Sequence, residues 1–192
     1  MAVGAIGDPY ITLADLRAYM GITVDSDDAE LAAAIESVSR EIERHCGRQF
    51  HRAEELSTRT YTPTASTWTH VDDFWTTDGL RVEVNRWGDG WETVDPVAEP
   101  ENGIVDGQPG WPYYRLSGLP ACRRVRVTAR WGWPEVPAPV RQAAKILAAE
   151  TVTLRTAPLG VAGVDDYGVV RVRDSRMAAG KLAKYIKRVL VG

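Results

Sequence analysis

Apolar residues recur every three or four positions in several parts of the chain, and this spacing predicts helices that bury one face. The clearest case covers residues 26–46. Acidic residues open this segment and Gly47 follows it, as is usual at the two ends of a helix. Its apolar stripe consists of Leu31, Ile35, Val38, Ile42 and Cys46. We therefore expect a helix over about 26–46 that packs this stripe into a core.

Two further helices are predicted by the residues at their ends. Thr12 and Asp15 have the spacing of a capping box, so a short helix should start there and stop at Gly21. Prolines lead up to Pro139, and proline is tolerated at the start of a helix but not inside it. An alanine-rich helix is therefore expected over 139–156.

The C-terminal part of the chain is predicted to hold a loop and a basic helix. Glycines are spread over 157–168, which favours a flexible loop, and 169–172 could form a short strand. A last helix is expected over about 175–190, with lysines on one side. Its apolar side consists of Ala178, Leu182, Tyr185, Ile186 and Val189.

Between residues 57 and 133 the pattern changes to alternating apolar and polar positions, which predicts half-buried strands. The alternation is clearest at 80–84 and 124–128 and weaker at 59–61 and 113–116. Turns are predicted where a glycine follows a polar residue or a proline. These pairs include Asp78-Gly79, Asn102-Gly103 and Pro109-Gly110.

These elements predict an α+β fold in which a helical body carries an inserted antiparallel β-region. An N-terminal helix pair, a central helix and a C-terminal helix would make up the body. The expected segments are an N-terminal helical segment (1–56), a Trp-rich β-region (57–133) and a C-terminal helical segment that completes the body (134–192).

Composition narrows the class of protein. The chain has 192 residues, of which 44% are hydrophobic and 26% charged, as in an ordinary globular protein. No apolar run approaches the length of a membrane span, and the first residues lack the features of a signal peptide. Two cysteines make a disulfide framework improbable, so we expect a reducing compartment.

Charge is distributed unevenly along the chain. Residues 1–56 carry five arginines against eleven acids, whereas 171–192 carry seven basic residues against one acid. The two ends are therefore electrostatically complementary, and they could meet within one chain or between neighbouring copies.

The sequence contains no convincing catalytic, metal or cofactor motif. Neither a Gly-x-Ser-x-Gly elbow nor a Gly-rich phosphate loop occurs, so we expect no enzyme and no cofactor. His45, Cys46 and His51 lack a known zinc spacing, and Cys46 fits a core thiol better. The other polar group (His70, Asp72 and Asp73) is interpreted as a solvated strand end or turn.

All seven tryptophans lie in the β-region, and two interpretations are open. A small β-domain needs large side chains to fill its core, and this is favoured for most of them. Alternatively, exposed aromatic side chains could bind carbohydrate, a partner protein or single-stranded nucleic acid. The residues are Trp68, Trp75, Trp87, Trp91, Trp111, Trp131 and Trp133.

Several motifs occur in an order that resembles a known family. The chain opens on Tyr-Ile-Thr-Leu-Ala-Asp-Leu (10–16), and the helix after it ends in Cys-Gly-Arg-Gln-Phe (46–50). A β insertion, a Trp-Gly-Trp-Pro exit (131–134) and Val-Pro-Ala-Pro-Val-Arg-Gln-Ala-Ala (136–144) follow, and then a Gly-containing loop with a basic helix. This order resembles the tailed-phage head–tail connector, or head-completion adaptor, proteins, most clearly over about 10–50 and 131–191.

The resemblance implies a non-enzymatic virion protein at the head–tail interface, assembled in the host cytoplasm. Such a subunit would form a ring, expected to be twelve-fold, beneath the portal protein. The ring would extend the DNA channel and provide the platform for the tail or a stopper. Double-stranded DNA would pass without sequence-specific binding, and no membrane would be involved. A head-to-tail ring joins two different faces of neighbouring copies.

The resemblance also points to candidate residues. In the family the terminal helix is associated with portal attachment, which makes Lys181, Lys184, Tyr185, Lys187 and Arg188 the portal-docking candidates. Deletion of 176–192 is expected to abolish docking and leave the fold intact. The subunit-packing candidates are Leu31, Ile35, Val38, Ile42, Ala144 and Leu147.

Two alternative functions belong to other classes. The first is a monomeric binding module whose Trp-rich β-face takes carbohydrate or another surface ligand. The second is a small DNA-binding accessory protein that uses the basic face of the last helix, whose retention of duplex DNA would depend on salt.

Overall fold

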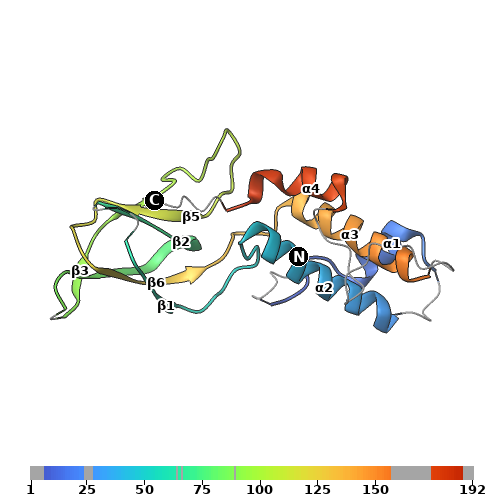
Figure 1. Ribbon diagram of the computed structural model, residues 1–192, viewed down its shortest axis with the longest axis horizontal. Helices are drawn as coiled ribbons and strands as arrows, with labels where there is room; N and C mark the ends of the chain where they lie inside the picture. Colours follow the sequence, from blue (N-terminus) through green and yellow to red (C-terminus); the bar gives the residue numbers. More distant parts are fainter. Residues whose placement is uncertain are drawn as a thin grey trace. The chain divides into compact units, whose positions relative to one another are not determined.

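A computed structural model describes residues 7–23, 28–63, 65, 67–88, 90–156 and 174–187. The described chain divides into two compact units (Figure 1). One unit holds helices and consists of 7–50 together with the described part of 136–187. The other is a β-unit formed by His51–Glu135.

The helical unit contains the predicted helices with well-defined ends. Helix α1 spans Leu13–Met20, and Thr12 caps it in a capping box with Asp15, as predicted. The backbone and side-chain hydrogen bonds that Asp15 receives from Thr12 hold the pKa of this carboxyl below its usual value. Gly21 ends the helix in the left-handed conformation with φ 69°, which glycine adopts without strain.

Helix α3 is the centre of this unit, because it contacts α1, α2 and α4. Helix α2 spans Asp28–Cys46 and α3 spans Ala138–Thr156, close to the predicted bounds. Gly47 follows α2 with φ 61°. The apolar stripe predicted for α2 lies in the core of this unit, since every member of it is at most 3% exposed. Val140, Ala144 and Leu147 of α3 are equally buried.

The last helix is shorter than predicted. Helix α4 spans only Arg176–Leu182, and a 3₁₀-helix, η2 (Ala183–Tyr185), continues it before the backbone becomes extended at Ile186. Ala178 and Leu182 are fully buried, so this short element is part of the core. The loop predicted over 157–168 and the strand predicted over 169–172 lie outside the described residues.

The β-unit is built on one antiparallel sheet with the order β1-β6-β2-β5-β4, and β3 also pairs with β2. All four predicted strand segments lie in it. In β6 the alternation is regular, because Val125, Val127, Ala129 and Trp131 are buried and the residues between them are not. The strands are β1 (Ser57–Tyr61), β2 (Trp68–Asn85), β3 (Glu92–Val94), β4 (Val97–Glu99), β5 (Tyr113–Ser117) and β6 (Arg124–Trp131).

Strand β2 contains a segment that the sequence analysis assigned to a turn. Asp78-Gly79 lies inside this 18-residue strand, at a place where the pairing with β6 changes register between Thr76 and Arg81. Gly79 has φ 76°, so it supports an irregularity within the strand and does not reverse the chain. The turn predicted there is therefore wrong.

The predicted helical body with an inserted β-region is also wrong, although mixed helix and strand content was expected. In the sequence the sheet lies between the two parts of the helical unit, but it is a compact unit in its own right and not an appendage of a helical body. It has a core of its own, so the protein is a mixed α/β structure with a six-stranded antiparallel sheet and four α-helices in the described residues. That core consists of Val71, Phe74, Val82, Val84, Leu116, Leu119, Val125, Val127, Ala129 and Trp131.

The Trp-Gly-Trp motif at the end of β6 is explained by a close backbone approach. Trp131 and Trp133 are 1% and 2% exposed, and Gly132 between them bridges to Arg52. Gly132 has φ 103°, and a Cβ atom placed on it would lie 1.9 Å from the carbonyl oxygen of His51. Only glycine therefore allows the segment around His51 to pass here.

We predict that Gly132→Ala destabilises the protein by about 3 kcal/mol or more, because the added methyl overlaps a backbone atom that cannot move independently. Gly118→Ala is the matched control. Gly118 also has a positive φ (75°), but nothing lies within 4 Å of its Cβ position, so only about 1–2 kcal/mol is expected. Urea unfolding of both variants measures the difference, and equal losses would contradict the close approach.

Candidate assembly interface

The portal-docking candidates lie on a short segment at the end of the helical unit. Lys181 of α4 and Lys184 of η2 are exposed, whereas Tyr185 and Lys187 are half-buried. Neither Lys181 nor Lys184 has an ion-pair partner within the described part of the chain. Arg188 lies outside the described residues. The two exposed lysines are therefore available to a partner.

This segment is anchored at both ends. At its start, the Ser175 hydroxyl caps α4 by accepting from the Ala178 N–H (3.4 Å) and donates to Glu150 on α3 (3.0 Å). At its end, the Lys187 N–H donates to the Cys46 carbonyl at the end of α2 (2.8 Å). The lysines are thus presented from a fixed backbone.

Aromatic rings continue this anchoring towards the N-terminal segment. The Tyr185 ring meets Phe50 edge-on, with centroids 5.8 Å apart, and Phe50 meets Tyr10 in the same way at 5.8 Å. Phe50 is fully buried and Tyr10 is 4% exposed. The three rings connect segments that are far apart in the sequence.

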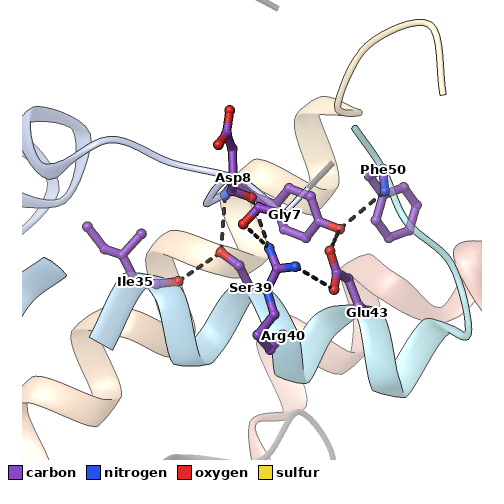
Figure 2. Close-up of polar contacts among 8 residues, drawn as sticks. Gly7, Asp8, Ile35, Ser39, Arg40, Glu43 and Phe50 are labelled. Carbon is purple, nitrogen blue, oxygen red and sulfur yellow. Dashed lines mark hydrogen bonds and ion pairs between the residues drawn. The ribbon is translucent and has the colours of Figure 1, made fainter. Parts of the chain in front are cut away.

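Tyr10 also organises a network of hydrogen bonds around α2 (Figure 2). Its hydroxyl donates to Glu43 (2.9 Å) and accepts from the Phe50 N–H (3.2 Å). Its backbone N–H donates to the buried Ser39 hydroxyl (3.1 Å), which in turn donates to the Ile35 carbonyl (2.8 Å). Burial raises the pKa of Tyr10 well above its usual value, so the hydroxyl keeps its proton and remains a donor.

Arg40 joins the same network from the α2 side. Its guanidinium donates to the carbonyl oxygens of Gly7 and Asp8, both at 3.0 Å, and pairs with Glu43 at 2.9 Å (Figure 2). The extended segment before α1 is therefore held to α2 by both side-chain and backbone bonds.

The acids of the N-terminal part are largely engaged within the chain. Asp28 pairs with Arg17, and Glu41 pairs with Arg44 at 3.1 Å. Asp15 pairs with Lys145 of α3 at 3.3 Å. These acids are therefore neutralised by arginines of the same segment and by Lys145 of α3, and none of these pairs joins the two oppositely charged ends of the chain.

The six subunit-packing candidates lie in the interior of the helical unit. All are at most 3% exposed, so they pack the helices of one chain and present almost no surface to another copy. They are Leu31, Ile35, Val38, Ile42, Ala144 and Leu147.

The polar group of β2 is not the solvated strand end that was expected. His70 stacks on Tyr114, and Asp72 accepts hydrogen bonds from Arg59 (2.7 Å) and Tyr61 (3.0 Å). Asp73 is buried and accepts from the Trp133 indole N–H at 2.8 Å. These side chains lie within a long strand and fix the packing of the sheet.

No group of three or more potential metal-ligating side chains occurs in the described residues. Cys46 is 1% exposed, and burial raises the pKa of its thiol to about 12, as expected for a core cysteine. In the same part of the chain, none of the helices has the length and apolar character needed to cross a membrane.

The tryptophans are divided between core and surface. Trp131 and Trp133 are buried as favoured, and Trp68, Trp75 and Trp111 are half-buried. Trp87 and Trp91 are 74% and 37% exposed, which the sequence pattern did not distinguish. Their position beside a Gly-containing hairpin loop was the available signal.

We predict that Tyr10→Phe lowers the free energy of unfolding by about 1–3 kcal/mol, because the buried Phe50 N–H loses its acceptor and Glu43 loses a donor. Tyr19→Phe is the control, since the Tyr19 side chain is 44% exposed and should change stability by less than about 0.5 kcal/mol. Chemical denaturation compares the two, and equal effects would show that the hydroxyl does not organise the unit.

Comparisons with known proteins found one family that part of the sequence matches and solved structures with a similar fold. Residues 10–72 match the family model described as "Phage gp6-like head-tail connector protein". No curated protein matches the chain significantly.

Solved structures of gene transfer agent (GTA) particles share the fold over nearly the whole chain. A chain from the neck of an empty GTA particle computed with C6 symmetry has 19% identity and a TM-score of 0.55, covering 95% of this chain and 93% of that one. A chain from the virion of a native GTA particle has 15% identity and a TM-score of 0.57, with coverages of 100% and 97%. A third, from a native GTA neck computed with C12 symmetry, has 15% identity and a TM-score of 0.53, with coverages of 100% and 99%. Residues 10–72 thus carry the sequence of the phage gp6-like head–tail connector family, and the resemblance to head–tail connector proteins is confirmed.

Proposed function

We propose that this chain is a structural subunit of the neck in a tailed phage or a phage-like particle, located at the head–tail interface of the virion. The observation that carries this proposal is the connector-family match over residues 10–72 in a chain whose fold covers 93–99% of the three GTA chains. Its role is to join other components, and no chemical turnover is part of it.

The subunit is proposed to act in a closed ring. The related GTA necks were computed with C6 and C12 symmetry, which supports a cyclic homo-oligomer with twelve copies as the expected number. The ring would extend the channel below the portal and let double-stranded DNA pass without sequence-specific contacts. Its other side would provide the platform for a tail or stopper protein.

The portal-docking surface is proposed to be the C-terminal segment with Lys181, Lys184, Tyr185 and Lys187, continued by Arg188. Lys181 of α4 and Lys184 of η2 project from a segment whose position is set by Ser175 and by the backbone bond from Lys187 to Cys46. Such a rigid basic surface favours an acidic groove on the partner, since charge complementarity guides association and excludes wrong partners.

We predict that the double variant Lys181→Glu/Lys184→Glu reduces attachment to portal-bearing capsids at least tenfold and leaves the fold unchanged, because both side chains are exposed. Lys181→Arg/Lys184→Arg keeps the charge and should attach normally. Attachment is measured by co-sedimentation with capsids, and circular dichroism verifies folding. Normal attachment of the charge-reversed chain would refute this docking surface.

Deletion of 176–192 is a poorer test than it seemed from the sequence. It would remove Ala178 and Leu182, which are fully buried, and with them part of the core of the helical unit. Loss of attachment would then report unfolding as readily as loss of a docking surface.

The ring itself is tested by sedimentation over a wide concentration range with negative-stain imaging. Closed rings with a central hole support the neck subunit. A strict monomer that fails to bind portal-bearing capsids and whose tryptophan fluorescence responds to a sugar would instead support the binding-module alternative.

A further inference from the structure

The β-unit presents two tryptophans at one end of its sheet. Trp87 lies in the loop between β2 and β3 and is 74% exposed, and Trp91 follows at 37%. Two large aromatic side chains exposed together are uncommon on a protein surface that has no partner, because burying each of them is strongly favourable. Tryptophan and arginine are also the residues that dominate binding energy at protein interfaces.

The loop that carries Trp87 is braced. The Asn85 side chain donates to the Gly90 carbonyl (2.8 Å) and accepts from the Gly88 N–H (2.9 Å). Arg86 and Glu92 pair across the hairpin at 3.0 Å. The backbone at Gly88 and Gly90 is therefore tied to Asn85, which lowers the entropy cost of docking the exposed Trp87.

Arginines lie near these tryptophans, and two of them are not neutralised by the carboxylates of the hairpin. Arg126 covers the Trp91 ring at 4.3 Å, but it is neutralised by an ion pair with Glu83 (2.9 Å). Arg123 and Arg124 lie next to the hairpin, since the Arg123 N–H donates to the Asn85 carbonyl and Arg124 is paired with Asn85 in the sheet. Both arginines are exposed, and neither has an ion-pair partner among the residues described. We call Trp87, Trp91, Arg123 and Arg124 the hairpin patch.

On α2 the helical unit carries a surface with small side chains and a negative charge, whereas the hairpin patch has large side chains and positive charges. Five consecutive positions at helical spacing are exposed, four of them with small side chains and one with a carboxylate. Glu36 has no ion-pair partner in the described chain, whereas Asp28, Glu41 and Glu43 are paired. This α2 face therefore offers small side chains, which leave room for a larger side chain of a partner, and an exposed carboxylate without an ion-pair partner among the described residues. It consists of Ala29, Ala32, Ala33, Glu36 and Ser37.

We propose that the hairpin patch of one copy docks on the α2 face of the next copy. A ring with head-to-tail contacts requires two different and complementary faces on the same chain. The hairpin patch and the α2 face meet that requirement in charge and in apolar character. This inference rests on the proposed ring function and names the two faces that would build the ring.

The test uses charge reversal on both faces. We predict that Arg124→Glu and Glu36→Lys each raise the concentration needed for half-assembly at least tenfold, and that the chain with both changes regains assembly. An equimolar mixture of the two single variants should also regain assembly, because in an alternating ring every contact again joins opposite charges.

Trp87→Ala should weaken assembly whether or not the charges are reversed. Ile104→Ala is its control, since Ile104 is 46% exposed in the same unit.

Assembly is measured by sedimentation velocity and, in parallel, as the number of copies bound to portal-bearing capsids. Loss in the single variants with recovery in the mixture supports the proposed contact. Rings that form normally in all variants, or a mixture that does not recover, overturn this contact while the neck function stands. A wild-type chain that neither assembles nor binds capsids overturns both. If Trp87→Ala spares assembly but prevents attachment of a tail component or duplex DNA, the patch binds that component and the contact between copies is refuted.

Discussion

The hydroxyl of Tyr10 is the constraint on which the helical unit depends. It donates to Glu43 and accepts from the Phe50 N–H. One buried group therefore joins the segment before α1 both to α2 and to the residues that follow α2. The Phe50 position in turn provides the surface on which Tyr185 packs. Because a buried donor or acceptor without a partner is costly, these hydrogen bonds favour this arrangement of the three segments.

This arrangement gives the C-terminal segment its orientation. Helix α4 is too short to be stable by itself, and it is held by the burial of Ala178 and Leu182, by Ser175 and by the Lys187 backbone. The exposed lysines therefore occupy defined positions. A docking element built in this way presents its charges without first having to fold on the partner.

The β-unit is organised by a different constraint, the approach of two backbone segments at Gly132. The absence of a side chain there lets the His51 carbonyl come close, and the flanking tryptophans are buried on either side. Trp133 then reaches the buried Asp73 of β2, whose carboxylate it satisfies. These contacts hold the sheet around a core of its own, and the β2–β3 hairpin carries exposed residues.

The sequence by itself determined the local elements. The spacing of Leu31 to Cys46, the Thr12–Asp15 capping box and the alternation in β6 each depend on neighbours along the chain, and all three were predicted. The order of motifs also indicated the resemblance to head–tail connector proteins, whose family model residues 10–72 match. What only the tertiary structure decided depends on partners far away in the sequence. Asp78-Gly79 has the local chemistry of a turn, yet pairing with β6 keeps it inside a strand. The last helix ends early, where Tyr185 meets Phe50 and Lys187 bonds to Cys46. Whether a tryptophan lies in the core or on the surface likewise depends on the side chains packed around it. The sequence therefore could not tell that Trp133 is buried beside Asp73 and that Trp87 is exposed on a hairpin.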